Sequence, residues 1–180
     1  MEERQAVDSL LSALEEFFKT LRPIDNIHAI VFAKNQTMKV NEYSLHTKTF
    51  HSSEGSELRD FFRDAFSRGM TGRTCLYEAM VAGIDLIRRM PEKDQKFLVV
   101  FSDGADINSG FDSSVVSSMA EEIPNFEAYC IDYMPKRKMN RFLQSFAESH
   151  GGRSWKAESA TELLPIFQTF TSTLLYRYVV

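Results

Sequence analysis

The strongest chemical signal in the sequence is an aspartate placed directly after an apolar run. Residues 97–101 read Phe-Leu-Val-Val-Phe, and Ser102, Asp103 and Gly104 follow them. A short continuous apolar run bounded by turn residues predicts a strand buried on both faces, as in parallel sheets. Ligands of open α/β sheets bind just past the carboxyl ends of such strands. Asp103 is therefore a candidate ligand-binding residue; the alternative is that Asp103 and Asp106 only shape a turn.

A second stretch with chemical potential is Gly-Arg-Thr-Cys-Leu-Tyr-Glu-Ala at residues 72–79. It reads as a glycine turn, a threonine and then a helix. On structural grounds alone, Thr74 is predicted to cap that helix, with its hydroxyl oxygen accepting hydrogen bonds from backbone N–H groups. In the other interpretation, the hydroxyl of Thr74 binds a ligand.

The two stretches, GRTCLYEA and VVFSDGADINS, resemble the von Willebrand factor type A domain family. In that family a threonine after a Gly-x-Thr turn and an aspartate after the fourth strand belong to a metal-ion-dependent adhesion site. The resemblance carries these roles to Thr74 and Asp103 as metal ligands. It implies that Mg²⁺ or Mn²⁺ is held by oxygen ligands. An Asp or Glu of a partner protein would then complete the coordination, so the site serves recognition rather than turnover.

The sequence departs from the family at the first strand. The family's Asp-x-Ser-x-Ser motif has no counterpart here, and Met1 stands where the family's methionine after the second serine falls. We therefore expect metal binding to be weak or absent. The missing strand belongs in the middle of the sheet, so its absence predicts exposed strand edges at residues 27–33 and 97–101. We expect a second copy of the chain, or the apolar tail at residues 176–180, to fill the slot.

The elements that must position these residues alternate between strands and amphipathic helices. Helical spacing of apolar residues predicts helices over residues 6–21, 58–66, 74–87, 113–123, 138–150 and 159–174. Buried strands are predicted at residues 27–33, 97–101 and 126–132, with an edge strand or hairpin arm at 37–50, a short strand at 154–156 and a strand-like tail at 175–180. This order predicts one domain over residues 1–180, with a doubly wound, mostly parallel α/β sheet, helices on both faces and a missing first central strand.

Composition restricts the function classes. The 180 residues carry a net charge of −4, which gives no reason to expect nucleic-acid binding. No apolar run approaches the roughly 20 residues of a membrane span. The two cysteines, Cys75 and Cys130, have no metal-binding spacing and fit buried thiols. None of these features indicates a cellular compartment.

Enzyme signatures are largely missing from the sequence. It has no dinucleotide-binding glycine turn, no phosphate loop and no Gly-x-Ser-x-Gly elbow. The alternative from another class is a metal-dependent hydrolase built on Asp103, Asp106 and Asp132. A third interpretation is an interaction scaffold with an inactive metal site. We expect a protein-binding module that is not an enzyme, with its recognition surface at residues 68–76 and 102–111.

Overall fold

The computed structural model describes residues 2–19, 21–33, 44–51, 53–67, 74–102, 106, 109–133 and 140–177. It divides the chain into two compact units, each assembled from separate stretches of sequence. The first unit comprises Met1–Val31, His46–Met70 and Ala157–Val180, and the second comprises Phe32–Leu45 and Thr71–Lys156. One domain spanning residues 1–180 stays a prediction.

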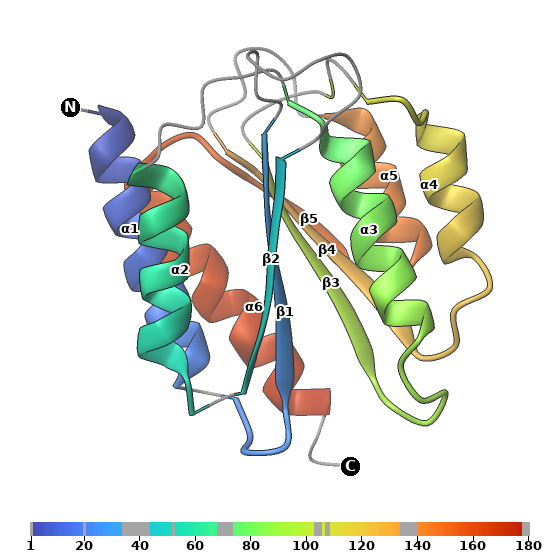
Figure 1. Cartoon of the computed structure of the whole chain (residues 1–180), viewed down its shortest axis with the longest axis horizontal. Coiled ribbons are helices and arrows are strands. Elements are labelled where there is room, and N and C mark those ends of the chain that lie inside the picture. Colours follow the sequence, from blue (N-terminus) through green and yellow to red (C-terminus); the bar gives the residue numbers. More distant parts are fainter. Residues whose placement is uncertain are drawn as a thin grey trace. The chain divides into compact units, whose positions relative to one another are not determined.

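The first unit combines a two-stranded sheet with helices from both ends of the chain (Figure 1). Its elements are α1 (Glu2–Phe18), β1 (Asn26–Ala33), β2 (Ser44–His51), α2 (Gly55–Ser67), the 3₁₀ turn η1 (Ala160–Glu162) and α6 (Leu163–Arg177). Phe18, Ala29, Phe50 and Leu58 form its buried cluster. The Phe17 ring on α1 lies 5.2 Å from the Phe170 ring on α6, so the two terminal helices share one apolar contact.

The second unit carries the predicted parallel sheet. Its elements are α3 (Leu76–Arg88), β3 (Lys96–Ser102), α4 (Ser113–Ala120), β4 (Phe126–Tyr133), α5 (Arg141–Ser149) and β5 (Arg153–Ala157). The strand order is β3-β4-β5. Strands β3 and β4 are parallel, and the register runs from Lys96 opposite Phe126 to Ser102 opposite Asp132. The carboxyl ends of both strands therefore lie at the same edge of the sheet, where ligands of open α/β sheets bind.

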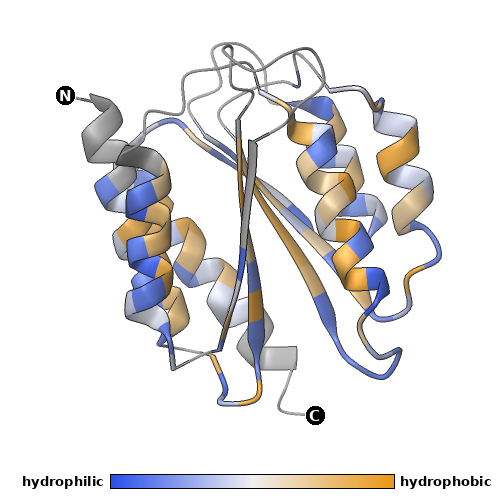
Figure 2. Cartoon of the chain, in the orientation of Figure 1, coloured by the Kyte–Doolittle hydropathy of each residue, from blue (hydrophilic) through white to orange (hydrophobic). Residues whose placement is uncertain are grey.

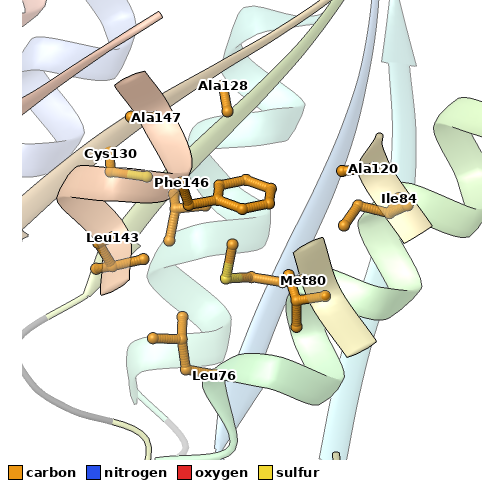
Figure 3. Packing of buried hydrophobic residues seen from close by; sticks show 11 residues of the cluster. Leu76, Met80, Ile84, Ala120, Ala128, Cys130, Leu143, Phe146 and Ala147 are labelled. Carbon is orange, nitrogen blue, oxygen red and sulfur yellow. The ribbon is translucent and has the colours of Figure 1, made fainter. Parts of the chain in front are cut away.

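One face of this sheet and the three helices beside it enclose a core cluster (Figure 3). The cluster consists of Leu76, Met80, Ile84, Val100, Val116, Ala120, Ala128, Cys130, Leu143, Phe146 and Ala147. The α3 positions predicted to face inward from helical spacing are all buried there or beside it, including Gly83 and Ile87. Burial raises the pKa of the Cys130 thiol to about 12, with a smaller contribution from the charge of Asp132. Cys130 is therefore a protonated core residue at neutral pH, as expected for a buried thiol.

The opposite face of the β3-β4-β5 sheet is aromatic. Phe101 stacks on Tyr133 with ring centroids 5.5 Å apart, and Tyr129 stacks on Trp155 at 6.0 Å. Such pairs contribute on the order of 0.5–1.5 kcal/mol beyond the apolar area they bury. Tyr129 lies opposite Val99 in the register, so Val99 of β3 lies on the same face of the sheet as these aromatic side chains.

The termini of two helices differ from the prediction. Helix α1 spans Glu2–Phe18 rather than residues 6–21. The strand-like tail predicted at residues 175–180 is wrong through residue 177, because α6 continues as a helix to Arg177. Adding a residue to an existing helix costs far less than starting a new element, so an established helix extends through residues of strand-like composition. Among the described residues, no helix combines the length and apolar character needed to cross a membrane.

Candidate functional site

Thr74 lies in coil directly before the start of α3 and is half-buried. The prediction that it caps this helix is wrong. Cys75 occupies the N-cap position, with φ −111° and ψ 60°, and its side chain makes no capping hydrogen bond. The hydroxyl of Thr74 is therefore not assigned to capping, and its interpretation as a metal ligand stays a prediction.

The acceptors at the N-terminus of α3 come from the loop after β3, about 30 residues further along the chain. Asp106 Oδ1 accepts a hydrogen bond from the Tyr77 N–H at 3.2 Å. Ser109 Oγ accepts from the N–H groups of Tyr77 and Glu78, at 3.1 and 3.3 Å. Asp106 also accepts from the Ser109 N–H at 3.0 Å and from the Ser109 hydroxyl. The first turn of α3 is thus capped through tertiary contacts.

Helix α3 also accepts a hydrogen bond from the same loop. Glu78 is only 4 % exposed, and its Oε1 accepts a hydrogen bond from the Gly110 N–H. We call this reciprocal set, made of Tyr77 and Glu78 on α3 with Asp106, Ser109 and Gly110 on the loop, the α3 clasp. It fixes the segment that leaves β3 against the helix that starts after Thr74. The two stretches singled out in the sequence are thereby brought together.

The role of Asp106 follows from the clasp. Both of its carboxylate oxygens accept hydrogen bonds there, which matches the interpretation that it shapes the turn. Asp103 lies outside the described residues, so its role as a metal ligand stays a prediction. Within the part of the chain that the structure describes, no three His, Cys, Asp or Glu side chains gather closely enough to hold a metal ion.

Asp132 is the penultimate residue of β4 and lies opposite Ser102, the last residue of β3, in the register. It is 1 % exposed, and its Oδ2 accepts a hydrogen bond from the Asn140 N–H at 2.7 Å. Asn140 in turn caps α5, because its Oδ1 accepts from the Phe142 N–H at 3.1 Å. The remaining Asp132 oxygen, Oδ1, is buried, and none of the described residues donates a hydrogen bond to it. Asp132 therefore anchors the start of α5 rather than joining Asp106 in one group.

The rim next to the clasp exposes an aromatic side chain. Phe111 is 43 % exposed although it is a large apolar residue. Asp112 follows it and caps α4, accepting hydrogen bonds from the N–H groups of Ser114 at 2.9 Å and Val115 at 3.1 Å. Burial, and to a lesser degree the charges of Asp106 and Asp112, raise the pKa of Tyr77. Its hydroxyl is therefore protonated at neutral pH.

The Asp112 cap predicts a specific acid sensitivity. Hydrogen bonds from the Ser114 hydroxyl and then from the Val115 and Ser114 amides lower the pKa of Asp112 below its usual 3.8. Because the folded pKa is lowered, this stabilisation is present above the unfolded pKa and is lost as pH falls through the folded value. Asp112→Asn keeps an acceptor but cannot titrate. Urea midpoints measured from about pH 6 to pH 2 should fall less steeply in Asp112→Asn than in the wild type; parallel curves would contradict the assignment.

Comparison with solved structures identifies the fold. A von Willebrand factor type A protein from Catenulispora acidiphila superposes with a TM-score of 0.71 at 14% sequence identity, over 94% of this chain. The chain spans only 38% of the length of that protein. An uncharacterized membrane spanning protein from Vibrio fischeri matches with a TM-score of 0.40 and 16% identity, covering 93% of this chain and 84% of its own. No family model and no curated protein matches the sequence. The first similarity confirms the predicted von Willebrand factor A-like α/β fold.

Proposed function

We propose that this chain is a protein-binding module of the von Willebrand factor A type and is not an enzyme. Its recognition surface is the rim made of residues 68–76, before and at the start of α3, and residues 102–111, after β3. The α3 clasp is the observation that carries the proposal, because it holds the loop after β3 against the first turn of α3, directly after residues 68–76 in the chain. Open α/β sheets bind their ligands at this place.

The exposed Phe111 supports a protein as the ligand. Large aromatic side chains supply much of the binding energy where they are buried by a partner, and Phe is enriched at protein interfaces. Phe111 lies one residue after Gly110 of the clasp, so its backbone is anchored while its side chain is 43 % exposed. An anchored, exposed aromatic residue loses little conformational entropy on binding.

The metal component of the proposal rests on two oxygen donors, the hydroxyl of Thr74 and the carboxylate of Asp103. These are hard ligands of the kind that Mg²⁺ and Mn²⁺ accept. Asp106 does not add to the set, because the clasp engages both of its oxygens. A bound ion would supply an open coordination position for an Asp or Glu side chain of the partner. With one carboxylate the site binds metal weakly.

The hydrolase alternative places Asp103, Asp106 and Asp132 around one metal ion. The described geometry gives it no support, since Asp106 belongs to the clasp and Asp132 holds the Asn140 N–H. We therefore expect no turnover of phosphate or carboxylate esters with Mg²⁺ or Mn²⁺ present. Turnover that disappears in Asp103→Asn would replace the binding proposal with the hydrolase.

A thermal melt in Mg²⁺, in Mn²⁺ and in chelator tests the metal site. A ligand at 100 times its Kd adds about 2.7 kcal/mol to the free energy of unfolding. For a chain of this length, this corresponds to a rise in Tm of roughly 5–10 °C. We expect the rise in the wild type and its loss in Asp103→Asn and Thr74→Val.

Asp112→Asn is the matched control for this melt, because it removes a carboxylate from the same rim and keeps the α4 cap. It should retain the metal-dependent rise in Tm. A wild-type Tm that is the same in metal and in chelator would remove the metal from the proposal. A further rise with a Glu-bearing peptide, absent with its Gln-bearing counterpart and absent in chelator, would identify the partner's carboxylate as the completing ligand.

A further inference from the structure

Glu78 is a buried carboxylate with one oxygen that the α3 clasp does not use. Helix α3 is hydrophobic along most of its length (Figure 2), and Glu78 is the acidic residue of its first turn. Its Oε1 accepts a hydrogen bond from the Gly110 N–H. Its Oε2 is buried too, and none of the described residues donates a hydrogen bond to it. The clasp therefore satisfies only half of this carboxyl group.

The environment of Glu78 compensates its charge only in part. An ionised carboxylate is unfavourable in a buried place unless donors or a positive charge compensate it. The start of a helix supplies some compensation, because its backbone dipoles favour negative charge. The basic residues of α3 do not add to it, since Arg88 and Arg89 lie at the other end of the helix and pair with carboxylates there. A buried oxygen in this situation is a candidate position for a bound cation.

The position of Glu78 in α3 brings its carboxyl group close to Thr74. Cys75 is the N-cap residue, so Glu78 is the third residue of the helix, N3. A glutamate at N3 reaches back toward the backbone of the N-cap residue, which Thr74 directly precedes. The Gly110 contact holds the same carboxyl group against the loop after β3, which carries Asp103. Glu78 therefore connects the two stretches that contain the proposed metal ligands.

The unused oxygen distinguishes Glu78 from Asp106. The clasp engages both carboxylate oxygens of Asp106, through the N–H groups of Tyr77 and Ser109. Glu78 gives one oxygen to the clasp, so the other can bind an ion without loss of the Gly110 contact. A carboxylate that a hydrogen bond already orients is prepared for an ion before the ion arrives, which favours binding.

We propose that Glu78 Oε2 is a ligand of a divalent cation, Mg²⁺ or Mn²⁺, together with the hydroxyl of Thr74. A hydroxyl and a carboxylate oxygen are hard donors of the kind that both ions accept. The inference rests on the proposed function and adds to it, because the resemblance that assigns Thr74 and Asp103 gives Glu78 no role. With Glu78 the site has two carboxylates instead of one. It then retains a cation in the free chain, before a carboxylate of a partner binds.

Glu78→Gln tests this role with little change in shape. The glutamine keeps a side-chain oxygen that can accept from the Gly110 N–H, but it loses the charge. The Tm in Mn²⁺ is compared with the Tm in chelator for each variant, so that a change in basal stability cancels. Loss of an oriented ligand should raise the Kd for Mn²⁺ at least about tenfold. At 100 times the wild-type Kd, the rise in Tm should therefore fall to about half or less.

Asp132→Asn is the matched control for Glu78→Gln. Asp132 is also buried, and its Oδ2 accepts a hydrogen bond from the Asn140 N–H at 2.7 Å. None of the described residues donates to its Oδ1, so the substitution makes the same chemical change at a carboxylate outside the clasp. Asp132→Asn should keep the full metal-dependent rise in Tm. An equal loss in the two variants would overturn the specific role of Glu78.

Carboxyl ¹³C NMR of the wild-type chain tests the same contact without a substitution. On saturation with Mg²⁺ the Glu78 carboxyl resonance should shift, and chelator should reverse the shift, whereas the Asp132 resonance should stay in place. A Glu78 resonance that does not move would overturn the inference.

The outcomes separate this inference from the proposed function. If Asp103→Asn loses the metal-dependent rise in Tm and Glu78→Gln keeps it, the role of Glu78 is wrong and the proposed site stands. If Glu78→Gln loses the rise and Asp103→Asn keeps it, Glu78 is a ligand and Asp103 is not. If neither ion raises the Tm of the wild type, the role of Glu78 is wrong together with the metal component of the proposed function.

Discussion

Substitution of Gly152 with alanine is expected to lower the free energy of unfolding by about 3 kcal/mol or more. An ideal Cβ on Gly152 would lie 1.8 Å from the Ala128 carbonyl oxygen and 2.7 Å from its carbon. Both contacts are with backbone atoms, so no side-chain rotation relieves them. Ala128 is fully buried in the core cluster, and its N–H donates to the His150 carbonyl at 3.3 Å. Relief of the clash must therefore displace β4 itself.

Two other glycines provide graded controls for this substitution. Gly151 has φ 69°, in the left-handed region, two residues after the end of α5 at Ser149; alanine at this position should cost about 1–2 kcal/mol. The nearest atoms to a Cβ on Gly55 belong to the Phe18 side chain, at 3.7 Å and beyond, which is ordinary contact. Urea unfolding should rank the losses as Gly152→Ala, then Gly151→Ala, then Gly55→Ala. A Gly152→Ala loss as small as that of Gly55→Ala would show that β4 and β5 separate easily.

The parts of the fold that the sequence predicts well are those set by short-range periodicity. The apolar run at residues 97–101 and the run at 126–132 correspond to β3 and β4, which pair in parallel. Helical spacing also identifies the buried side of α3, where Leu76, Met80 and Ile84 face the core. In these stretches, neighbouring residues alone decide which side of an element is apolar.

The parts that the sequence does not predict are set by contacts between distant residues. Thr74 has the type and position of an N-cap, yet the acceptors for the Tyr77 and Glu78 amides come from Asp106 and Ser109. Nothing within one turn of Thr74 indicates this. A buried N–H group needs an acceptor, but that acceptor can come from any part of the chain. Here the acceptors come from tertiary contacts, and they replace the cap that the local sequence favours.

Strand β3 shows how local composition and strand order can differ. Its residues predict an interior strand, and the structure gives them a terminal place in the sheet. The conflict is between local composition and strand order, and such conflicts concentrate where a surface has a partner or a function.

Removal of the Asp106 side chain is the second large effect that we expect. Asp106→Ala should lower the free energy of unfolding by about 1–3 kcal/mol, the cost of leaving part-buried donors without their acceptor. The affected donors are the N–H groups of Tyr77 and Ser109 and the Ser109 hydroxyl. Asp60→Ala, on the exposed side of α2 where Asp60 pairs with Arg63, is the matched control. It should change the free energy of unfolding by less than about 0.5 kcal/mol.

A double-mutant cycle with Ser109→Ala decides whether the clasp acts as one unit. Ser109 Oγ accepts from two α3 amides and its hydroxyl donates to Asp106, so either single substitution already disturbs both residues. The double variant should therefore lose less than the sum of the singles, with an interaction energy of about 0.5–3 kcal/mol. Additive losses would mean that Asp106 and Ser109 cap α3 independently. In that case Asp106→Ala would leave the loop after β3 in place, and any metal-dependent rise in Tm would survive the substitution. If the clasp instead acts as one cooperative unit, Asp106→Ala should abolish that rise together with the cap.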